Sequence, residues 1–141
     1  MADTVQSWNE KIIEEFRANG GEVSTANFGL SLILLHHTGA RTGEKRINPL
    51  RSLFDGEGTW LVVASAQGAD SHPHWYHNVM AHPEVCIEAP GRGTVSVRAE
   101  VLAGTERDKA WAAFTAAYPM FLQYQQETTR IFPVIVLRRP E

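Results

Sequence analysis

Residues 29–54 read GLSLILLHHTGARTGEKRINPLRSLF, two short apolar runs separated by a polar loop. The runs, 29–37 and 46–54, are rich in branched side chains, a composition typical of β-strands. The loop between them contains Gly39 and Gly43, and glycine is common where a chain reverses direction. This stretch therefore predicts two strands joined by a short basic loop.

Further apolar runs of the same character follow along the chain. In TVSVRAEVL, valine and alanine alternate with polar residues, as expected for a strand with one face in water. The sequence DGEG at 55–58 is a hairpin signal, which predicts antiparallel pairing of the strands around it. With the first two runs we expect six strands, the last four at 59–66, 84–89, 94–103 and 133–139.

Helical patterns flank and interrupt these strands. Trp8, Ile12 and Phe16 recur every four residues among acidic ones, which predicts an amphipathic helix within residues 1–20. A short helix should begin near Pro73 and end by residue 82, and a longer one should begin at Thr105 as its cap and end before residue 119. The residues alone thus indicate an α+β fold, a mostly antiparallel sheet or barrel decorated by helices.

Composition narrows the classes of function. The 141 residues suit one domain, and 13 Lys+Arg against 16 Asp+Glu give a net charge of −3. That charge argues against a protein that covers nucleic-acid phosphates broadly. The single cysteine, Cys86, excludes an internal disulfide and fits a reducing cytoplasm. The N-terminus lacks the apolar stretch of a signal peptide, and no apolar run approaches a membrane span.

The basic loop is the first candidate site. Arg41, Lys45 and Arg46 stand against Glu44 alone, although the protein is acidic overall. Guanidinium groups and loop N–H groups bind phosphate or carboxylate well. The alternative is a solvated hairpin whose charges only aid solubility. The loop is not a nucleotide P-loop, because it lacks the Gly-Lys-Ser/Thr ending.

Residues 64–78, ASAQGADSHPHWYHN, form the second candidate site. Here a predicted strand turns into a helix whose first N–H groups are free to donate, and Trp75 and Tyr76 could pack on a flat heterocycle. The rival is a metal site formed by His72, His74 and His77. Their side chains diverge at a helix start, so we expect caps or surface residues and no metal.

Residues 117–125, AYPMFLQYQ, form the third candidate site. Tyr118, Phe121 and Tyr124 recur every three residues, and a tyrosine hydroxyl there could orient or protonate a ligand. The alternative is core packing, the usual role of aromatic stripes. No G-x-S-x-G nucleophile is present. The three segments together favour binding of a flat, anionic small molecule.

In this order, TGARTGEKRINPL, LVVASAQGADSHPHWYHNVMAHPEV and AYPMFLQYQQETTRIFPVIVL resemble the deazaflavin-dependent nitroreductase family, the A-type split-barrel reductases that use coenzyme F420. The resemblance covers roughly residues 28–138. It implies a split β-barrel over those residues, preceded by the N-terminal helix, and a flat 5-deazaflavin with a phosphate and glutamate tail as the cofactor.

Site residues follow by position. The resemblance implies that the tail contacts Arg41, Thr42 and Arg46. It implies that the rest of the cofactor contacts Ile47, Asn48, Pro49, Leu50, Arg51, Val63, Ala64, Ser65, Ala66, His74, Trp75, Tyr76, His77, Asn78 and Phe121. Catalytic roles would fall to Ser65, Tyr118 and Tyr124. Phe121 departs from the family, because the well-studied nitroreductase branch has a tyrosine there. Ala40 and Ala66 replace basic residues of that branch.

The implied reaction is hydride transfer from the reduced deazaflavin to an enone, lactone-conjugated alkene, quinone or nitroaromatic. A non-catalytic flavin, F420 or heme-type carrier and an FMN-dependent protein are the alternatives. We expect a small-molecule electron acceptor as partner, no nucleic acid, and a monomer or weak homodimer. We expect a cytoplasmic location, with contact to the inner membrane as the alternative; Glu10, Glu14 and Glu15 of the N-terminal helix oppose that contact.

Overall fold

The computed structural model describes residues 4–140, with side chains described from residue 7 onward. The predicted N-terminal helix is present as α1, and its first three predicted residues lie outside the described range. The helices are α1 (Thr4–Ala18), α2 (His74–Ala81), α3 (Gly104–Ala117) and α4 (Met120–Gln126), with 3-10 turns at Thr25–Asn27 and Ala66–Gly68. The strands are β1 (Leu32–Thr38), β2 (Lys45–Arg51), β3 (Leu53–Phe54), β4 (Thr59–Val63), β5 (Glu84–Ala89), β6 (Gly93–Val101) and β7 (Val134–Arg138).

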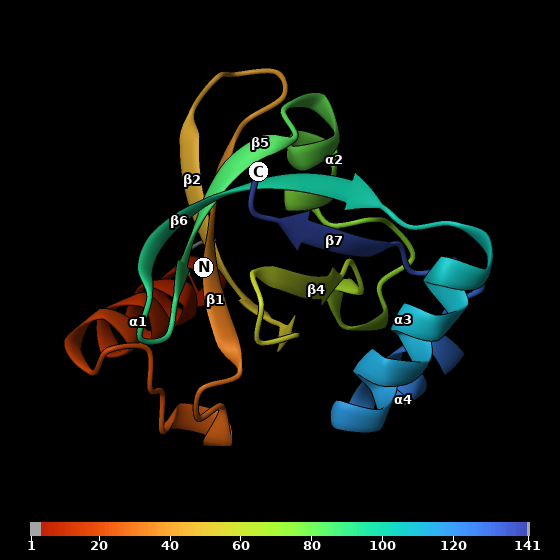
Figure 1. The fold of residues 1–141 in the computed structure, drawn as a ribbon, viewed down its shortest axis with the longest axis horizontal. Coiled ribbons are helices and arrows are strands. Elements are labelled where there is room, and N and C mark those ends of the chain that lie inside the picture. The colour runs from red at the N-terminus through yellow and green to blue at the C-terminus, as the bar shows by residue number, and fades with distance from the viewer. Residues whose placement is uncertain (1–3, 141) are drawn as a thin grey trace.

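The strands form one curled antiparallel sheet in the order β2-β1-β5-β6-β7-β4-β3 (Figure 1). Its two outermost strands, β2 and β3, are separated in the chain by Ser52 alone. β2 pairs with β1, whereas β3 pairs with β4 at the other end of the sheet. The sheet therefore curls until its ends meet at Ser52, which makes a split barrel.

This change of partner explains why the structure has seven strands where six were predicted. The run 46–54 is one apolar stretch in the sequence, but Ser52 interrupts it. The Ser52 N–H donates to the carbonyl of Ser31 at 2.8 Å, and the residue is buried. The composition of the run could not show that its two halves join opposite ends of the sheet.

The barrel interior is packed with side chains from alternate positions of the strands. It includes Ile33, Leu35, Trp60, Val62, Ile87, Ile135 and Leu137, all at most 2% exposed. Trp75 and Val79 of α2 join the same cluster and cover one end of it. Burying an aliphatic or aromatic side chain of this size contributes about 1.5–3 kcal/mol, so the interior holds α2 and its Trp75 in place.

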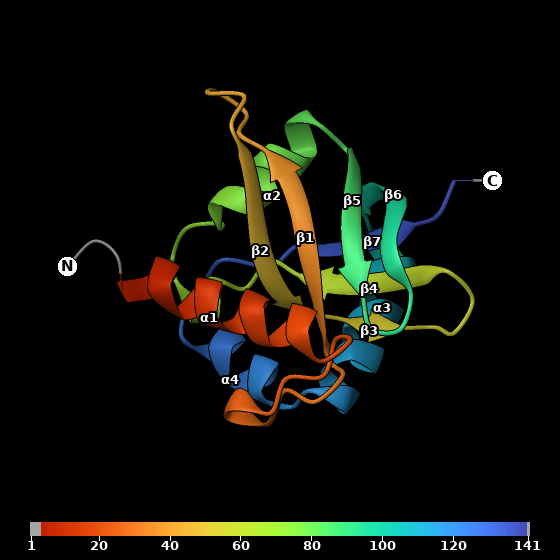
Figure 2. The same ribbon diagram turned by 90° about the vertical axis from the view of Figure 1, so that its left-hand side faces the viewer.

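α1 lies across the outer face of β1 and β2 (Figure 2). Ile12 and Phe16 pack there against Leu32 and Leu34 of β1, as the periodicity of the helix predicts. Trp8, on the same stripe, is 44% exposed. No helix among residues 4–140 has the length and apolarity needed to cross a membrane.

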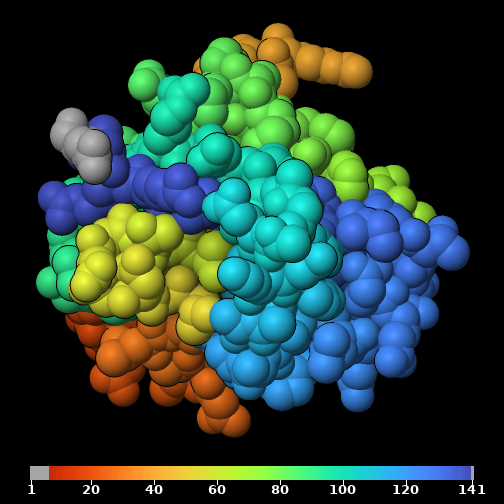
Figure 3. All heavy atoms as spheres, turned by 45° about the vertical axis from the view of Figure 1, so that its right-hand side comes forward, coloured from red at the N-terminus to blue at the C-terminus, as the bar shows by residue number. Residues whose placement is uncertain are grey.

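α3 and α4 lie side by side over one end of the barrel (Figure 3). Phe114 and Phe121 meet there edge to face with ring centroids 4.8 Å apart, and both pack with Phe132. The prediction that Thr105 caps α3 is wrong. The helix begins one residue earlier, after Ala103, and makes no side-chain cap.

Candidate functional site

A cavity of about 720 Å³ lies where β2, the segment after β4, and α4 come together. These are parts of the three segments that the sequence analysis singled out. β2 is an outer strand that pairs only with β1 among the described strands, so its other edge is unpaired. Trp8, Asn9 and Ile12 of α1 line the cavity as well. The fold thus gathers residues from as far apart in the chain as Trp8 and Tyr124.

The predicted site residues divide into two sets. Those that line the cavity are Asn48, Pro49, Leu50, Arg51, Val63, Ser65, Ala66, Trp75, Phe121 and Tyr124. Those that do not are Arg41, Thr42, Arg46, Ile47, Ala64, His74, Tyr76, His77, Asn78 and Tyr118.

The position of Ile47 follows from strand alternation. Successive side chains of β2 point to opposite faces, so Ile47 cannot share a face with Asn48. Ile47 packs with the cluster beneath α1, whereas Leu50 packs with the barrel interior. Ile47 therefore supports α1. Further along β2 both faces line the cavity, since Pro49 shares the face of Ile47 and Leu50 shares that of Asn48.

The basic loop between β1 and β2 stands out from the barrel beside α2 (Figures 1 and 2). Its turn is closed by the N–H of Gly39, which donates to the carbonyl of Glu44 at 2.8 Å. Arg46 pairs with Glu44 at 3.2 Å, but both side chains are exposed, so the pair adds little stability. Arg41 and Lys45 are also exposed. The cationic groups can therefore rearrange around an anion at little cost.

The turn after β4 is strained. Ala66 and Gln67 have φ values of +46° and +55°, in the left-handed region that non-glycine residues seldom adopt. Gly68 follows with φ +87°, and a Cβ there would lie 2.8 Å from a Glu127 carboxylate oxygen. Such strain persists only where the surroundings enforce it. The turn is held tightly against α4, and it forms one wall of the cavity.

Arg130, which the sequence analysis did not consider, supplies much of that enforcement. Its guanidinium donates to the carbonyls of Ala64 at 2.9 Å, Ser65 at 2.7 Å and Ala69 at 3.0 Å. It also donates to Nδ1 of His72 at 2.7 Å. One side chain thus clamps both ends of the strained turn. A lone arginine before the last strand carries no local pattern, so only the fold reveals it.

His72 is an acceptor in this arrangement. Burial, helped by the positive charge of Arg130, lowers the pKa of His72 below its usual value. The neutral ring can then accept the guanidinium hydrogen bond. Among residues 4–140 no group of three or more His, Cys, Asp or Glu side chains is placed to hold a metal ion.

The two tyrosines differ in their surroundings. Tyr118 donates its hydroxyl to the carbonyl of Ser52 at 2.7 Å, which ties the α3–α4 corner to the barrel seam. Burial raises the pKa of Tyr118. Tyr124 is half-buried and lines the cavity. Of the two, only Tyr124 is placed to meet a ligand there.

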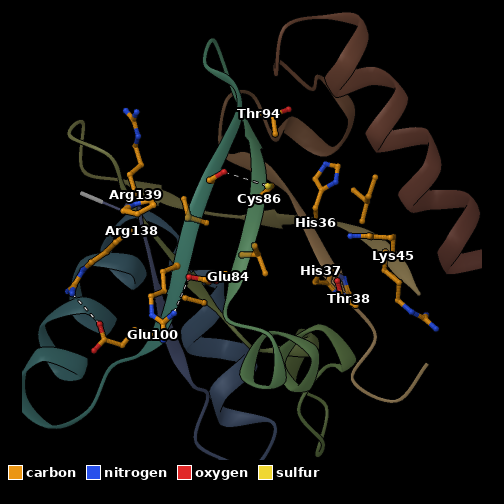
Figure 4. A pocket seen from close by; sticks show the side chains of 18 residues that line it. His36, His37, Thr38, Lys45, Glu84, Cys86, Thr94, Glu100, Arg138 and Arg139 are labelled. Carbon is orange, nitrogen blue, oxygen red and sulfur yellow. Dashed lines mark hydrogen bonds and ion pairs between the residues drawn. The ribbon is translucent and has the colours of Figure 1, made fainter. Parts of the chain in front are cut away.

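A larger cavity, about 980 Å³, lies over the outer face of β1, β5 and β6 (Figure 4). Four of the charged side chains that line it form two ion pairs with one another. Arg138 contacts Glu100 at 3.2 Å and Arg98 contacts Glu84 at 3.6 Å. Among the described residues that line it, histidine is the only aromatic type. A flat heterocycle is better matched by the smaller cavity, which has Trp75, Phe121 and Tyr124 in its walls.

Comparisons with known proteins agree with this geometry. Residues 8–139 match the family model described as F420H(2)-dependent quinone reductase. An F420H(2)-dependent quinone reductase of Mycobacterium tuberculosis is 35% identical over 109 residues, which cover 76% of this chain and 72% of the relative.

Two solved structures are similar in fold. An F420-H2 dependent reductase, FDR-A, has a TM-score of 0.69 and 35% identity, covering 77% of this chain and 94% of that one. A domain-swapped dimer has a TM-score of 0.72 and 30% identity, covering 96% and 100%. These matches confirm the split barrel and the resemblance to F420-dependent reductases. The chain belongs to the F420H(2)-dependent quinone reductase family.

Proposed function

We propose that this protein binds reduced coenzyme F420 in the cavity beside β2 and reduces a quinone-type acceptor by hydride transfer. The observation that carries the proposal is the cavity itself. It joins an unpaired strand edge to apolar, flat walls, in a chain of the F420H(2)-dependent quinone reductase family. A volume of about 720 Å³ is within the usual range for a small-molecule site.

The residues present fit a flat ring with an anionic tail. Trp75 is 7% exposed and supplies an aromatic part of the cavity wall, while Pro49, Leu50 and Val63 are apolar and exclude water. The unpaired edge of β2 offers backbone groups to the polar rim of a heterocycle. Arg41, outside the cavity on the exposed loop, is free to meet phosphate or carboxylate groups.

When bound, reduced coenzyme F420 supplies the hydride, and the protein supplies binding, orientation and electrostatics. The apolar wall restricts water, and the clamped turn at Ser65 and Ala66 fixes one side of the ring site. Tyr124 is the candidate proton donor to the acceptor, because its side chain lines the cavity. Tyr118 acts at the barrel seam, where its hydroxyl is already engaged. Enones, conjugated lactones and nitroaromatics are further acceptor classes that we propose on the same grounds.

The test is a titration of the purified protein with coenzyme F420, followed by quenching of tryptophan fluorescence, because Trp75 lies in the cavity wall. We expect binding that weakens with salt, and turnover of the reduced cofactor with a soluble 1,4-naphthoquinone. Replacing both Arg41 and Arg46 by Ala should raise Kd about tenfold or more and reduce its salt dependence.

Three other outcomes would change the proposed cofactor, the proposed activity or the proposed tail site. Binding of FMN or heme, with none of coenzyme F420, would contradict the proposed cofactor. Tight F420 binding without oxidation of the reduced form by quinones or enones would indicate a carrier. An unchanged Kd for coenzyme F420 in the Arg41→Ala, Arg46→Ala double variant would show that the cofactor tail does not bind at the basic loop.

We further propose that the protein acts in the cytoplasm as a monomer or weak homodimer. The similar structure described as a domain-swapped dimer supports a self-associating form of this fold. Glu10 and Glu14 are exposed on α1 and disfavour contact with anionic lipid. Sedimentation over a range of protein concentrations, and flotation with anionic vesicles, test these two statements.

A further inference from the structure

A chain of hydrogen bonds runs from the basic loop to Asn48, which lines the cavity. The backbone N–H of Ala40 lies 2.8 Å from Oδ1 of Asn78. Nδ2 of Asn78 lies 3.1 Å from Nδ1 of His37, and Nε2 of His37 lies 2.7 Å from Oδ1 of Asn48. His37 is 3% exposed and Asn78 is 8% exposed, so solvent has little access to these bonds.

The direction of every bond in this chain follows from its first member. A backbone N–H can only donate, so the Asn78 atom that it meets must be the amide oxygen. The other Asn78 atom is then the NH₂ group, which also can only donate, so Nδ1 of His37 must accept. Amide and imidazole orientations usually need an anchor of this kind to be assigned.

A neutral imidazole that accepts at Nδ1 carries its proton at Nε2. Burial above all lowers the pKa of His37, and the nearby charge of Arg46 acts in the same direction, which favours this neutral form. Nε2–H therefore donates to Asn48, and the Asn48 atom that receives it is the carbonyl oxygen. His36 and His37 are successive residues of β1 and point to opposite faces, and only His37 is buried, so only His37 can serve this inward role.

The amide NH₂ group of Asn48 takes no part in this chain of hydrogen bonds. Asn48 lines the cavity together with Leu50 and Trp75. No hydrogen bond to Asn48 Nδ2 is formed by any other residue in the described part of the chain. No buried side-chain polar atom in that part lacks a partner, so this NH₂ group is open to the cavity rather than sealed away.

We propose that Asn48 recognises a carbonyl oxygen of the bound ring system through its amide N–H donors. His37 and Asn78 are positioning residues that fix the direction of the Asn48 amide. The inference rests on the proposed function and specifies which ligand group the site recognises. A carbonyl of this kind is present in a deazaflavin ring and in a quinone, and both present an acceptor oxygen in the plane of a flat system.

Two substitutions of Asn48 separate donor loss from other effects. Asn48→Asp keeps an oxygen for Nε2–H of His37 but replaces the NH₂ group by a second oxygen. Asn48→Leu removes the donors without adding charge. We expect both variants to raise the Kd for coenzyme F420, or the KM for a soluble 1,4-naphthoquinone, by about tenfold, while kcat changes less than threefold. The constant that rises identifies the ligand whose carbonyl is bound.

Variants of His37 test the positioning role. His37→Gln retains an amide donor near Nε2, whereas His37→Leu leaves the Asn48 amide free to turn over. We expect His37→Leu to weaken the same constant three- to tenfold and His37→Gln to restore at least half of that loss on a logarithmic scale. Thermal melting of each variant, with assays well below its Tm, excludes unfolding as the cause.

Several results would overturn the inference. If Asn48→Asp loses affinity while Asn48→Leu does not, added charge is responsible and carbonyl recognition is wrong. If both variants match the wild type in Kd and KM, Asn48 does not bind the ligand, although the proposed function stands. If the wild type neither binds coenzyme F420 nor reduces the quinone, the proposed function itself fails.

Discussion

Removal of the Arg130 guanidinium should destabilise the turn that forms one wall of the cavity, although Arg130 itself does not line the cavity. Arg130→Met keeps most of the side-chain length and deletes every donor. Three of the lost hydrogen bonds are partly buried, namely those to Ala64, Ser65 and His72. At about 1 kcal/mol each, the free energy of unfolding should fall by roughly 3 kcal/mol. The bond to Ala69 is exposed and adds little.

The roughly 3 kcal/mol contributed by the Arg130 hydrogen bonds can be compared with the strain energy of the turn. Left-handed backbone at Ala66 and Gln67 costs about 1–2 kcal/mol per residue, so the clamp and the strain are of similar size. Without the clamp, the turn should relax toward ordinary φ values before the protein unfolds. Binding must then restore it, which raises the Kd for coenzyme F420 by about tenfold or more.

The assay is urea denaturation and F420 titration of the wild type, Arg130→Met, Arg130→Lys and Arg98→Met. Arg98 is a matched control, because its side chain is 63% exposed and its ion pair within residues 4–140 is a long contact with Glu84 at 3.6 Å. Arg130→Lys should recover part of the stability, since an ammonium cannot reach three acceptors with the planar fork of a guanidinium.

Arg130 does not clamp the turn if Arg130→Met loses no more stability than Arg98→Met. The turn does not control binding if Arg130→Met is destabilised by roughly 3 kcal/mol but binds coenzyme F420 as tightly as the wild type. In the second case the clamp would support the fold alone, and the conformation of the turn would be irrelevant to binding.

Two further predictions follow from single contacts. Tyr118→Phe removes the hydrogen bond to Ser52 and should lower the free energy of unfolding by about 1 kcal/mol, measured by denaturation, while kcat stays within a few-fold. A large loss of kcat in Tyr118→Phe would instead indicate that the Tyr118 hydroxyl takes part in catalysis. Hydrogen bonds from Thr25 and Ser24 lower the pKa of Glu15 from 4.5 to about 2. A depressed carboxyl pKa stabilises the fold fully above the unfolded value and progressively less as pH falls toward the folded one. Denaturation of wild type and Glu15→Gln should therefore differ most above pH 4.5 and converge near pH 2; a constant difference would contradict this.

The local elements were largely predictable from the sequence. Branched apolar runs indicated strands, because such side chains suit a half-buried pleated surface. The four-residue spacing of Ile12 and Phe16 predicted the buried face of α1, and both are at most 4% exposed. Local patterns of this kind report on a residue and its near neighbours, which is why helix starts such as that of α3 were less reliably placed.

The position of the site was predictable only in outline. Motifs identified β2, the β4–α2 segment and α4 as the functional parts, and the structure brings these three together around one cavity. Motifs did not distinguish Ile47, which supports α1, from Asn48, which lines the cavity. Strand alternation alone does not make the distinction, because Pro49 shares the face of Ile47 and still lines the cavity; the position of the cavity along β2 decides it.

The sequence by itself thus determined the strands, the amphipathic helix, the basic loop and the family, because these depend on composition and on short-range order. Tertiary structure alone decided that Ser52 joins the two ends of the sheet and that Arg130 clamps a turn 65 residues away. It also decided that His37 orients Asn48. Each of these depends on contacts between distant segments, and such contacts exist only once strand pairing has closed the barrel.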